Sequence, residues 1–252
     1  MSLRQFESGD RTGLIRLWQT VFGDGEDFIT EFLDEVVKPG RGAVWDEDGV
    51  IAAVAYIIDG ITVENQPLPY IYAVSTLPEY RGRGLGRAVS LACAEMSGGA
   101  VLHPAENSLF DWYGKMGFAP CSRIYEAKMP CGASALPLTP LSAEEYAKIR
   151  RSLLRGHRFA DYEPRLLDWW ARRWNGRFYG FEGGCLSISG SFVPELLAVS
   201  KGAQALAAAS GGNTVTVRTP ALEGFESFGA KCDFLAGLGA LPSAEYFPFV
   251  FD

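Results

Sequence analysis

The sequence predicts a mixed α/β fold of the α+β type, divided into two domains. Three observations predict it: in each half, helical periodicity precedes strand-like runs, a strand and a helix follow, and an uncharged, proline-rich segment separates the halves. The 252 residues are 48% hydrophobic and 21% charged, close to the averages for globular proteins. We place the domains at residues 1–130 and 140–252.

The first half begins with a short strand over residues 3–6 and two amphipathic helices. Asp10 is a candidate N-cap for the first helix, whose apolar residues recur at three- and four-residue steps up to Phe22. The second helix is expected from Glu26 to Val37, before Pro39-Gly40. Two strands at 42–45 and 50–58 then form a hairpin with a turn at 46–49, and 70–76 is a further strand.

The second half repeats this order after a linker, which we place at residues 129–141. Ser142 and Glu145 form a capping box that opens a helix to about Leu154, and a second helix is expected over 163–174. Strands are expected at 178–181, 185–189 and 214–218. We assign three tryptophans of the second helix to the core and four arginines to a solvent-exposed face: Trp169, Trp170, Trp174, Arg150, Arg151, Arg155 and Arg158.

Short sequence matches suggest that the second half is a copy of the first. Ala73-Val74-Ser75 matches Ala198-Val199-Ser200, and Ser97-Gly98-Gly99 matches Ser210-Gly211-Gly212. By this alignment the second half lacks twelve residues between the matched segments, where the first half carries a glycine-rich loop. We therefore expect a second domain that keeps the scaffold and has lost the site.

Composition excludes several classes of function. The net charge is −7 without a sustained basic stripe, so we expect no nucleic-acid partner. Five cysteines without a C-x-x-C pair, together with only two histidines, give no metal-site spacing and favour reduced thiols in a cytoplasm. The longest apolar run, residues 50–58, is too short to cross a membrane, and the N-terminus lacks the apolar core of a signal peptide.

The segment Arg81-Gly82-Arg83-Gly84-Leu85-Gly86, which we name the glycine loop, is the strongest chemical signal. It lies between a predicted strand and a helix, where backbone amides and a helix N-terminus can hold an anion. Arg81, Arg83 and Arg87 add positive charge for phosphate groups. The loop lacks the G-K-[ST] ending of a Walker loop, and Arg87 stands where a dinucleotide fingerprint needs glycine.

The stretch Val74 to Gly86 resembles the acetyl-CoA-binding signature of the GCN5-related N-acetyltransferases (GNAT), R/Q-x-x-G-x-G/A after a strand. Asn107 to Phe118 resembles the N…Y…GF segment of the same family. The duplicated layout is similar to the tandem modules of the enhanced-intracellular-survival type, without their lipid-carrier-like domain. The resemblance implies two GNAT-like domains, each a mostly antiparallel sheet flanked by helices, the second degenerate.

This resemblance also implies the roles of individual residues toward acetyl-CoA. The backbone of Val74, Ser75 and Thr76 would pair with the pantetheine arm like an added strand. The amides of the glycine loop, from Arg81 to Gly86, would hold the diphosphate, and Asn107 would reach the arm. Tyr113 occupies the family position of the proton donor to the leaving thiolate.

The general base is not fixed by the sequence. His103 ends a strand expected to border the cofactor cleft and could take the proton directly or through water. In the enhanced-intracellular-survival type the terminal carboxylate is the base, which makes Asp252 the second candidate, at the end of an apolar segment that could pack as a strand. Tyr70 and Tyr72 are candidates to line an acceptor cleft.

Two functions remain open from the sequence. The first is an acetyl-CoA-dependent N-acetyltransferase whose acceptor is a small-molecule or protein amine. The alternative is a non-catalytic acetyl-CoA sensor or interaction module. Neither needs a metal or a membrane, and a homodimer is compatible with both.

Overall fold

The computed structural model describes residues 1–249, apart from the side chains of residues 230–234. The chain forms two compact units. Unit 1 comprises residues 1–61, 67–119 and 236–241, and unit 2 comprises 62–66, 120–235 and 242–252. The mixed α/β class expected from the sequence is confirmed. The domain boundaries at 1–130 and 140–252 stay a prediction.

Unit 1 contains the hairpin, the glycine loop and the Asn107–Phe118 segment. Its sheet has the order β1-β2-β3-β6-β7-β15, with β15 contributing its residues 236–239. The elements are β1 (Ser2–Gln5), η1 (Ser8–Asp10), α1 (Arg11–Phe22), α2 (Glu26–Glu31), the π-helix η2 (Phe32–Val36), β2 (Gly42–Glu47), β3 (Val50–Ile58), β6 (Tyr70–Thr76), η3 (Pro78–Tyr80), α3 (Leu85–Met96), β7 (Gly99–Leu102) and α4 (Asn107–Gly114).

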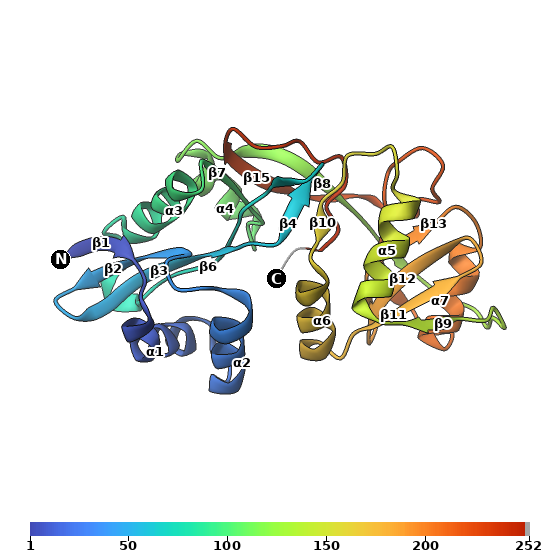
Figure 1. Ribbon diagram of the computed structural model, residues 1–252, viewed down its shortest axis with the longest axis horizontal. Helices are drawn as coiled ribbons and strands as arrows, with labels where there is room; N and C mark the ends of the chain where they lie inside the picture. Colours follow the sequence, from blue (N-terminus) through green and yellow to red (C-terminus); the bar gives the residue numbers. More distant parts are fainter. Residues whose placement is uncertain (250–252) are drawn as a thin grey trace. The chain divides into compact units, whose positions relative to one another are not determined.

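Helices cover both faces of the unit 1 sheet. In Figure 1, α1 and α2 lie below strands β1 to β3, and α3 lies above them. On the α1 and α2 face, Trp18 packs against Phe32, Tyr56 and Tyr72. On the α3 face, alanines of β3 pack against Val89 and Cys93, which are fully buried. Small residues on the strand let α3 approach the sheet closely.

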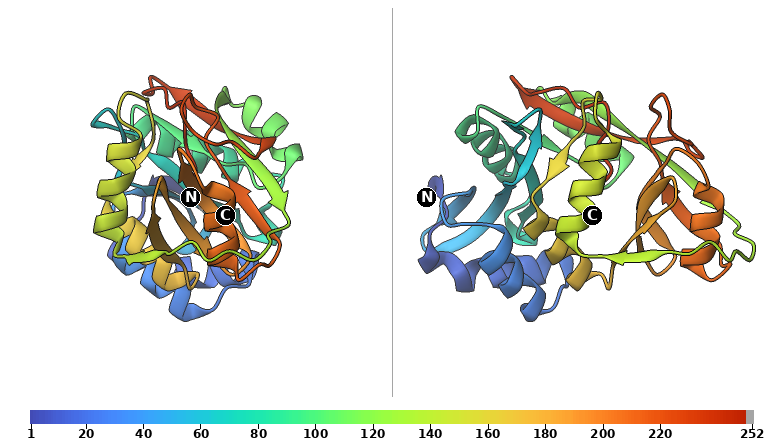
Figure 2. Two further views of the ribbon diagram at one scale, coloured as in Figure 1. Left: turned by 90° about the vertical axis from the view of Figure 1, so that its right-hand side faces the viewer. Right: turned by 45° about the vertical axis from the view of Figure 1, so that its right-hand side comes forward.

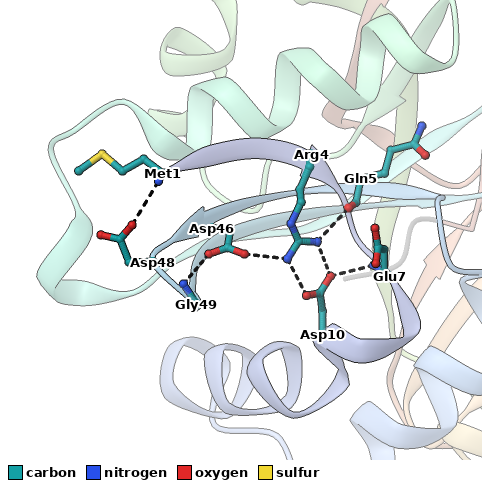
Figure 3. A network of polar contacts seen from close by, with 8 residues as sticks. All are labelled: Met1, Arg4, Gln5, Glu7, Asp10, Asp46, Asp48 and Gly49. Atoms are coloured by element: carbon teal, nitrogen blue, oxygen red, sulfur yellow. Dashed lines mark hydrogen bonds and ion pairs between the residues drawn. The ribbon is translucent and has the colours of Figure 1, made fainter.

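A network of ion pairs ties β1 to α1 and to the β2–β3 hairpin (Figure 3). Arg4 donates two hydrogen bonds of 2.7 Å to Asp10 and one of 2.9 Å to Asp46. Asp10 also accepts from the Glu7 amide, and Asp46 from the Gly49 amide. The hydrogen bonds from Arg4 lower the pKa of both carboxyl groups. Asp10 stands at the N-cap position as predicted, but its side chain binds Arg4 and does not cap α1.

Unit 2 has a sheet with the order β8-β14-β13-β12-β11-β9. In Figure 2, α5 and α7 lie on opposite sides of strands β11 to β13. The elements are β8 (Ala119–Met129), β9 (Thr139–Leu141), α5 (Ala143–Leu153), β10 (Asp161–Tyr162), α6 (Pro164–Arg173), β11 (Arg177–Phe181), β12 (Gly184–Ser189), β13 (Phe192–Ala198), α7 (Gly202–Ser210), β14 (Val215–Arg218) and β15 (Ala230–Gly239). The hairpin β4 (Ile61–Val63) and β5 (Gln66–Pro67) forms a small sheet with β10.

The two units repeat one order of elements. In each, a strand and two helices precede three antiparallel strands, and a helix then leads to a parallel strand, β7 or β14. Each sheet is continued by an antiparallel strand from the other half of the sequence, β15 beside β7 and β8 beside β14. This exchange of last strands was not expected from the sequence.

A β-bulge at the same place in both sheets fixes how the halves correspond. In unit 1, Ala55 lies opposite two residues between the pairs Val54–Ser75 and Tyr56–Tyr72. In unit 2, one residue also lies opposite two, between the pairs Ser187–Glu195 and Ser189–Phe192. By this register Ser75 corresponds to Glu195. The sequence match of Ala73-Val74-Ser75 with Ala198-Val199-Ser200 therefore does not align equivalent positions, and the deletion of twelve residues derived from it is wrong.

The buried Arg150 corrects a further expectation from the sequence. Its side chain has no exposed surface, and its Nε donates to Glu195 at 2.9 Å, so it does not belong to a solvent-exposed face. The Tyr146 hydroxyl donates to the same carboxylate at 2.5 Å. A buried charge is tolerated only with such a partner, and periodicity alone could not reveal a partner 45 residues away.

Other expectations about unit 2 are confirmed by its elements. Ser142 and Glu145 form the capping box at the start of α5. Trp169 and Trp170 are buried, as expected of core residues. The linker expected at 129–141 contains β9, which pairs with β11.

Within residues 1–249, no helix has the length and apolarity needed to span a bilayer.

Candidate functional site

Strand β6 carries the bulge that opens the site. At this bulge Ala73 and Val74 together lie opposite the single residue Ala55 of β3. Ala73 has a φ of 49°, in the left-handed region. The recorded pairing of β6 with β7 is one parallel pair, Tyr70 with Val101. Beyond it, the β7 side of residues 74–76 has no strand partner in the described part of the chain. A bulge that ends pairing in this way leaves N–H and C=O groups available to an extended ligand.

The glycine loop follows β6 and η3 and leads into α3. Gly82 and Gly84 have φ values of 77° and 79°, which favour glycine because a side chain there is strained. A Cβ atom at either position would meet no protein atom within 4 Å. Space is therefore open on the side where these glycines would carry a side chain, and a ligand can approach the backbone there.

The first turn of α3 presents its amides at the same place. Gly84 is the N-cap, and the Ala88 amide makes the first helical hydrogen bond, to the Gly84 carbonyl at 3.0 Å. The amides of residues 85–87 therefore have no carbonyl within the helix. Together with the partial positive charge of the helix N-terminus, they can hold an anion such as a diphosphate. Leu85 is buried below them in the core.

The loop arginines are not equivalent in the structure. Arg81 donates from Nε to the Thr76 carbonyl at 3.2 Å. Arg83 donates from Nη2 to Glu47 Oε1 at 2.6 Å, and its guanidinium lies over the Tyr80 ring at 5.3 Å. Sequence analysis missed Glu47, because a single acidic residue in a hairpin gives no local signal of a contact 36 residues away.

Helix α4 reaches the glycine loop through Trp112. A Cβ atom placed on Gly86 would lie 3.5 Å from the Trp112 ring and 3.3 Å from Thr76 Oγ1, so these three residues meet closely. Trp112 is 37% exposed. Asn107 is the first residue of α4 and is exposed. The structure thus brings both sequence motifs together.

Tyr113 follows Trp112 and points into the core. Its ring makes edge contacts with Trp112 and Phe118, and it belongs to the same apolar cluster as Leu85 and Val89. Burial raises the pKa of the Tyr113 hydroxyl well above that of an exposed phenol. The group is therefore neutral at physiological pH and can act only as a hydrogen-bond or proton donor to a developing anion. Among the described residues, its hydroxyl has no recorded partner.

The candidate bases are less well defined. His103 is half-buried and directly follows β7, the strand that neighbours β6. Asp252 lies outside the described residues. The segment before it contains an isolated bridge between Phe159 and Tyr246, and no strand is formed over 246–249. Tyr70 is buried, and Tyr72 packs on Trp18 and Phe32.

Comparison with known families decides what this arrangement is. Residues 2–121 match the family model described as an acetyltransferase (GNAT) domain. The N-terminal part of this chain is a GNAT acetyltransferase domain. All the predicted site residues except Asp252 lie within residues 2–121. Residues 2–121 are therefore an acyltransferase domain of a family that binds acyl-CoA.

Solved structures similar to this chain cover both units. A GNAT from Kribbella flavida is 19% identical, with a TM-score of 0.70, over 94% of this chain and 71% of that one. A GNAT from Anabaena variabilis is 14% identical, with a TM-score of 0.69, over 94% and 72%. Eis1 from Mycobacterium abscessus is 13% identical, with a TM-score of 0.64, over 95% and 74%. These likenesses show a shared fold. No curated protein matches the sequence.

Proposed function

We propose that this protein is an acetyl-CoA-dependent N-acetyltransferase that acetylates a primary amine by direct attack. The observation that supports the proposal is the meeting, within unit 1, of the end of β6, the glycine loop with its open space and the α4 segment, where Thr76, Gly86 and Trp112 lie close together. Residues 74–76 would bind the pantetheine arm, and residues 81–86 the diphosphate, with Asn107 beside the arm. The open space at Gly82 and Gly84 fits such a ligand.

The chemistry needs little from the protein beyond position and hydrogen bonding. When bound, acetyl-CoA supplies an activated acyl group on a thiol leaving group. The amine nitrogen forms the new C–N bond with its lone pair, the C–S bond breaks, and the electron pair goes to sulfur. The nitrogen loses one proton, for which His103 is a candidate base, and the sulfur gains one. Tyr113 would donate to the sulfur as its charge develops.

We further propose that unit 2 is a GNAT-like copy without a cofactor site. Only residues 199–201 separate β13 from α7, whereas 77–84 separate β6 from α3. The N-terminus of α7 is already occupied, because the Gly202 amide donates to Glu226 Oε2 at 2.7 Å. The Glu226 amide in turn donates to the Ala198 carbonyl at 2.7 Å. A carboxylate of the chain thus fills the place of a diphosphate.

Titration calorimetry should accordingly give one acetyl-CoA per chain. The physical reason is that the first amide of α7, that of Gly202, is paired with Glu226, whereas the amides of residues 85–87 at the start of α3 are open. The Gly84→Val protein serves as the matched control, since its single site should show at least tenfold weaker affinity. A stoichiometry of two in the wild-type protein, or a site of unchanged affinity in Gly84→Val, would show that unit 2 binds acetyl-CoA.

Release of free thiol from acetyl-CoA in the presence of a panel of amines tests the proposed activity. Small amines and a lysine-containing peptide should be compared with buffer alone. We expect thiol release that depends on at least one amine, with acetylated amine as the product. If acetyl-CoA binds while no amine accelerates thiol release, the alternative of a non-catalytic acetyl-CoA-binding module is supported instead.

A further inference from the structure

Glu47 holds the glycine loop from outside the motif that defines it. It is the last residue of β2 and pairs with Val50 across the hairpin. Its side chain is only 11% exposed, and each carboxylate oxygen has one donor: Arg83 Nη2 at 2.6 Å and Trp45 Nε1 at 3.0 Å. These two hydrogen bonds lower the pKa of the Glu47 carboxyl. The carboxylate is therefore ionised and oriented at neutral pH.

Arg83, the partner of Glu47 in this contact, is itself restrained by two neighbours. Its guanidinium is fixed by Glu47 at one end and lies over the ring of Tyr80, the last residue of η3. Arg83 is flanked by Gly82 and Gly84, the two loop residues with positive φ. Glycines make this backbone adaptable, so an ordered loop conformation needs an anchor. The Arg83 side chain supplies that anchor, since Glu47 belongs to a paired strand.

We propose that Glu47 is a positioning residue that braces the glycine loop through Arg83, and that Arg83 serves this brace and not the phosphate groups. The proposal rests on the proposed binding of acetyl-CoA by this loop. By this proposal the three arginines have different roles: Arg83 orders the loop, and Arg81 and Arg87 supply the positive charge that attracts the anion. It also explains why an acidic side chain lies beside an anion site.

The direction in which the Kd for acetyl-CoA changes in one variant separates this proposal from a purely electrostatic role of Glu47. Glu47→Ala removes a negative charge near the phosphate groups, so a purely electrostatic role predicts tighter binding of acetyl-CoA. Loss of a brace predicts weaker binding, which we expect to be about tenfold in Kd, equal to about 1.4 kcal/mol. KM for acetyl-CoA should rise with kcat unchanged at saturation.

Asp48→Asn is the matched control. Asp48 is the next residue and is exposed, its only recorded partner in the described chain being the N-terminal amine at 3.4 Å. Its φ is 54°, a conformation that asparagine tolerates well. This variant makes the same charge change without touching Arg83, and its Kd should equal the wild-type value or fall slightly. Glu47→Gln keeps a hydrogen-bond acceptor and should lie between Glu47→Ala and the wild type.

A double-mutant cycle and the salt dependence complete the test. Arg83→Ala should weaken binding as much as Glu47→Ala, and the double variant no more than either. The slope of log Kd against log salt should stay close to the wild-type value in all three, whereas loss of a phosphate contact would make it shallower. Tighter binding in Glu47→Ala, or additive effects with a reduced slope in Arg83→Ala, would overturn the proposal.

Trypsin provides a readout that does not need acetyl-CoA. It cleaves after Arg81 and Arg83, so a loosened loop in Glu47→Ala should be cut several-fold faster than in the wild type and in Asp48→Asn, at unchanged Tm. Equal cleavage rates would contradict the brace. If the wild-type protein does not bind acetyl-CoA, the proposed function fails, and the cleavage rates still decide whether Glu47 orders the loop.

Discussion

Replacing Tyr113 with phenylalanine is expected to lower kcat about a hundredfold and to leave KM for acetyl-CoA nearly unchanged. The substitution keeps the ring, which packs against Trp112 and Phe118, and removes only the hydroxyl. General acid catalysis is typically worth about 10²- to 10⁴-fold. An interaction that forms mainly as the thiolate develops lowers kcat without weakening the ground-state complex.

The buried position of Tyr113 sets where in this range the effect should fall. Burial raises the pKa of its hydroxyl, so complete transfer of the proton to a thiolate, with a pKa near 8.5, is unfavourable. The hydroxyl then contributes mainly a hydrogen bond to the developing negative charge, and the proton can arrive later from solvent. We therefore expect an effect near the lower end, of about a hundredfold.

Tyr56→Phe is the control for this experiment. Tyr56 also lies in unit 1 with a fully buried hydroxyl, and it packs on the opposite face of the sheet, against Trp18. Its loss should leave kcat unchanged. Steady-state kinetics with one accepted amine, together with Tm values, decide the outcome. A kcat for Tyr113→Phe within threefold of the wild type would assign Tyr113 to the core alone.

Gly84→Val should raise the Kd for acetyl-CoA at least tenfold, or about 1.4 kcal/mol. Gly84 is the N-cap of α3 with a φ of 79°, and a side chain there points into open space. In the complex that space would hold the diphosphate, so the valine methyl groups would displace it from the helix amides. The charge of the loop does not change, and the effect is therefore steric.

The valine also strains the backbone, and Gly98→Val controls for that. Gly98 follows α3 at its other end, with a φ of 68° and open space around the position of a Cβ atom. Both variants should lose similar stability, of about 1–3 kcal/mol, which Tm values will show. Only Gly84→Val should lose affinity in calorimetry. Equal affinities of the two folded variants for acetyl-CoA would show that the glycine loop does not bind it.

Local signals in the sequence were sufficient for elements with strong caps and periodicity. The strand Tyr70–Thr76 and the capping box at Ser142 are confirmed, because each depends on residues close together in the chain. The glycine loop could be placed before α3 for the same reason. The roles assigned to its residues stay predictions.

Contacts between distant residues were beyond such signals. Arg150 resembles a surface arginine until Glu195 is placed beside it, and Glu47 acquires a role only when the hairpin brings it to Arg83. Strand β15 was missed because its residues, glycine among them, show no clear alternation, and its pairing with β7 is decided by the fold as a whole. Short sequence identities also misaligned the two halves. Equivalent positions are set by the pairing of backbone groups between strands, which does not require identical residues.

The exchange of last strands has a consequence for how the protein is made. The strand that continues the unit 1 sheet beside β7 is synthesised only after almost the whole of unit 2. At about 5–20 residues per second on the ribosome, β7 waits roughly ten seconds for its neighbour. During that time this edge of β7 lacks the strand that pairs with it in the folded chain. A premature stop in unit 2 would therefore leave the unit 1 sheet without its last strand.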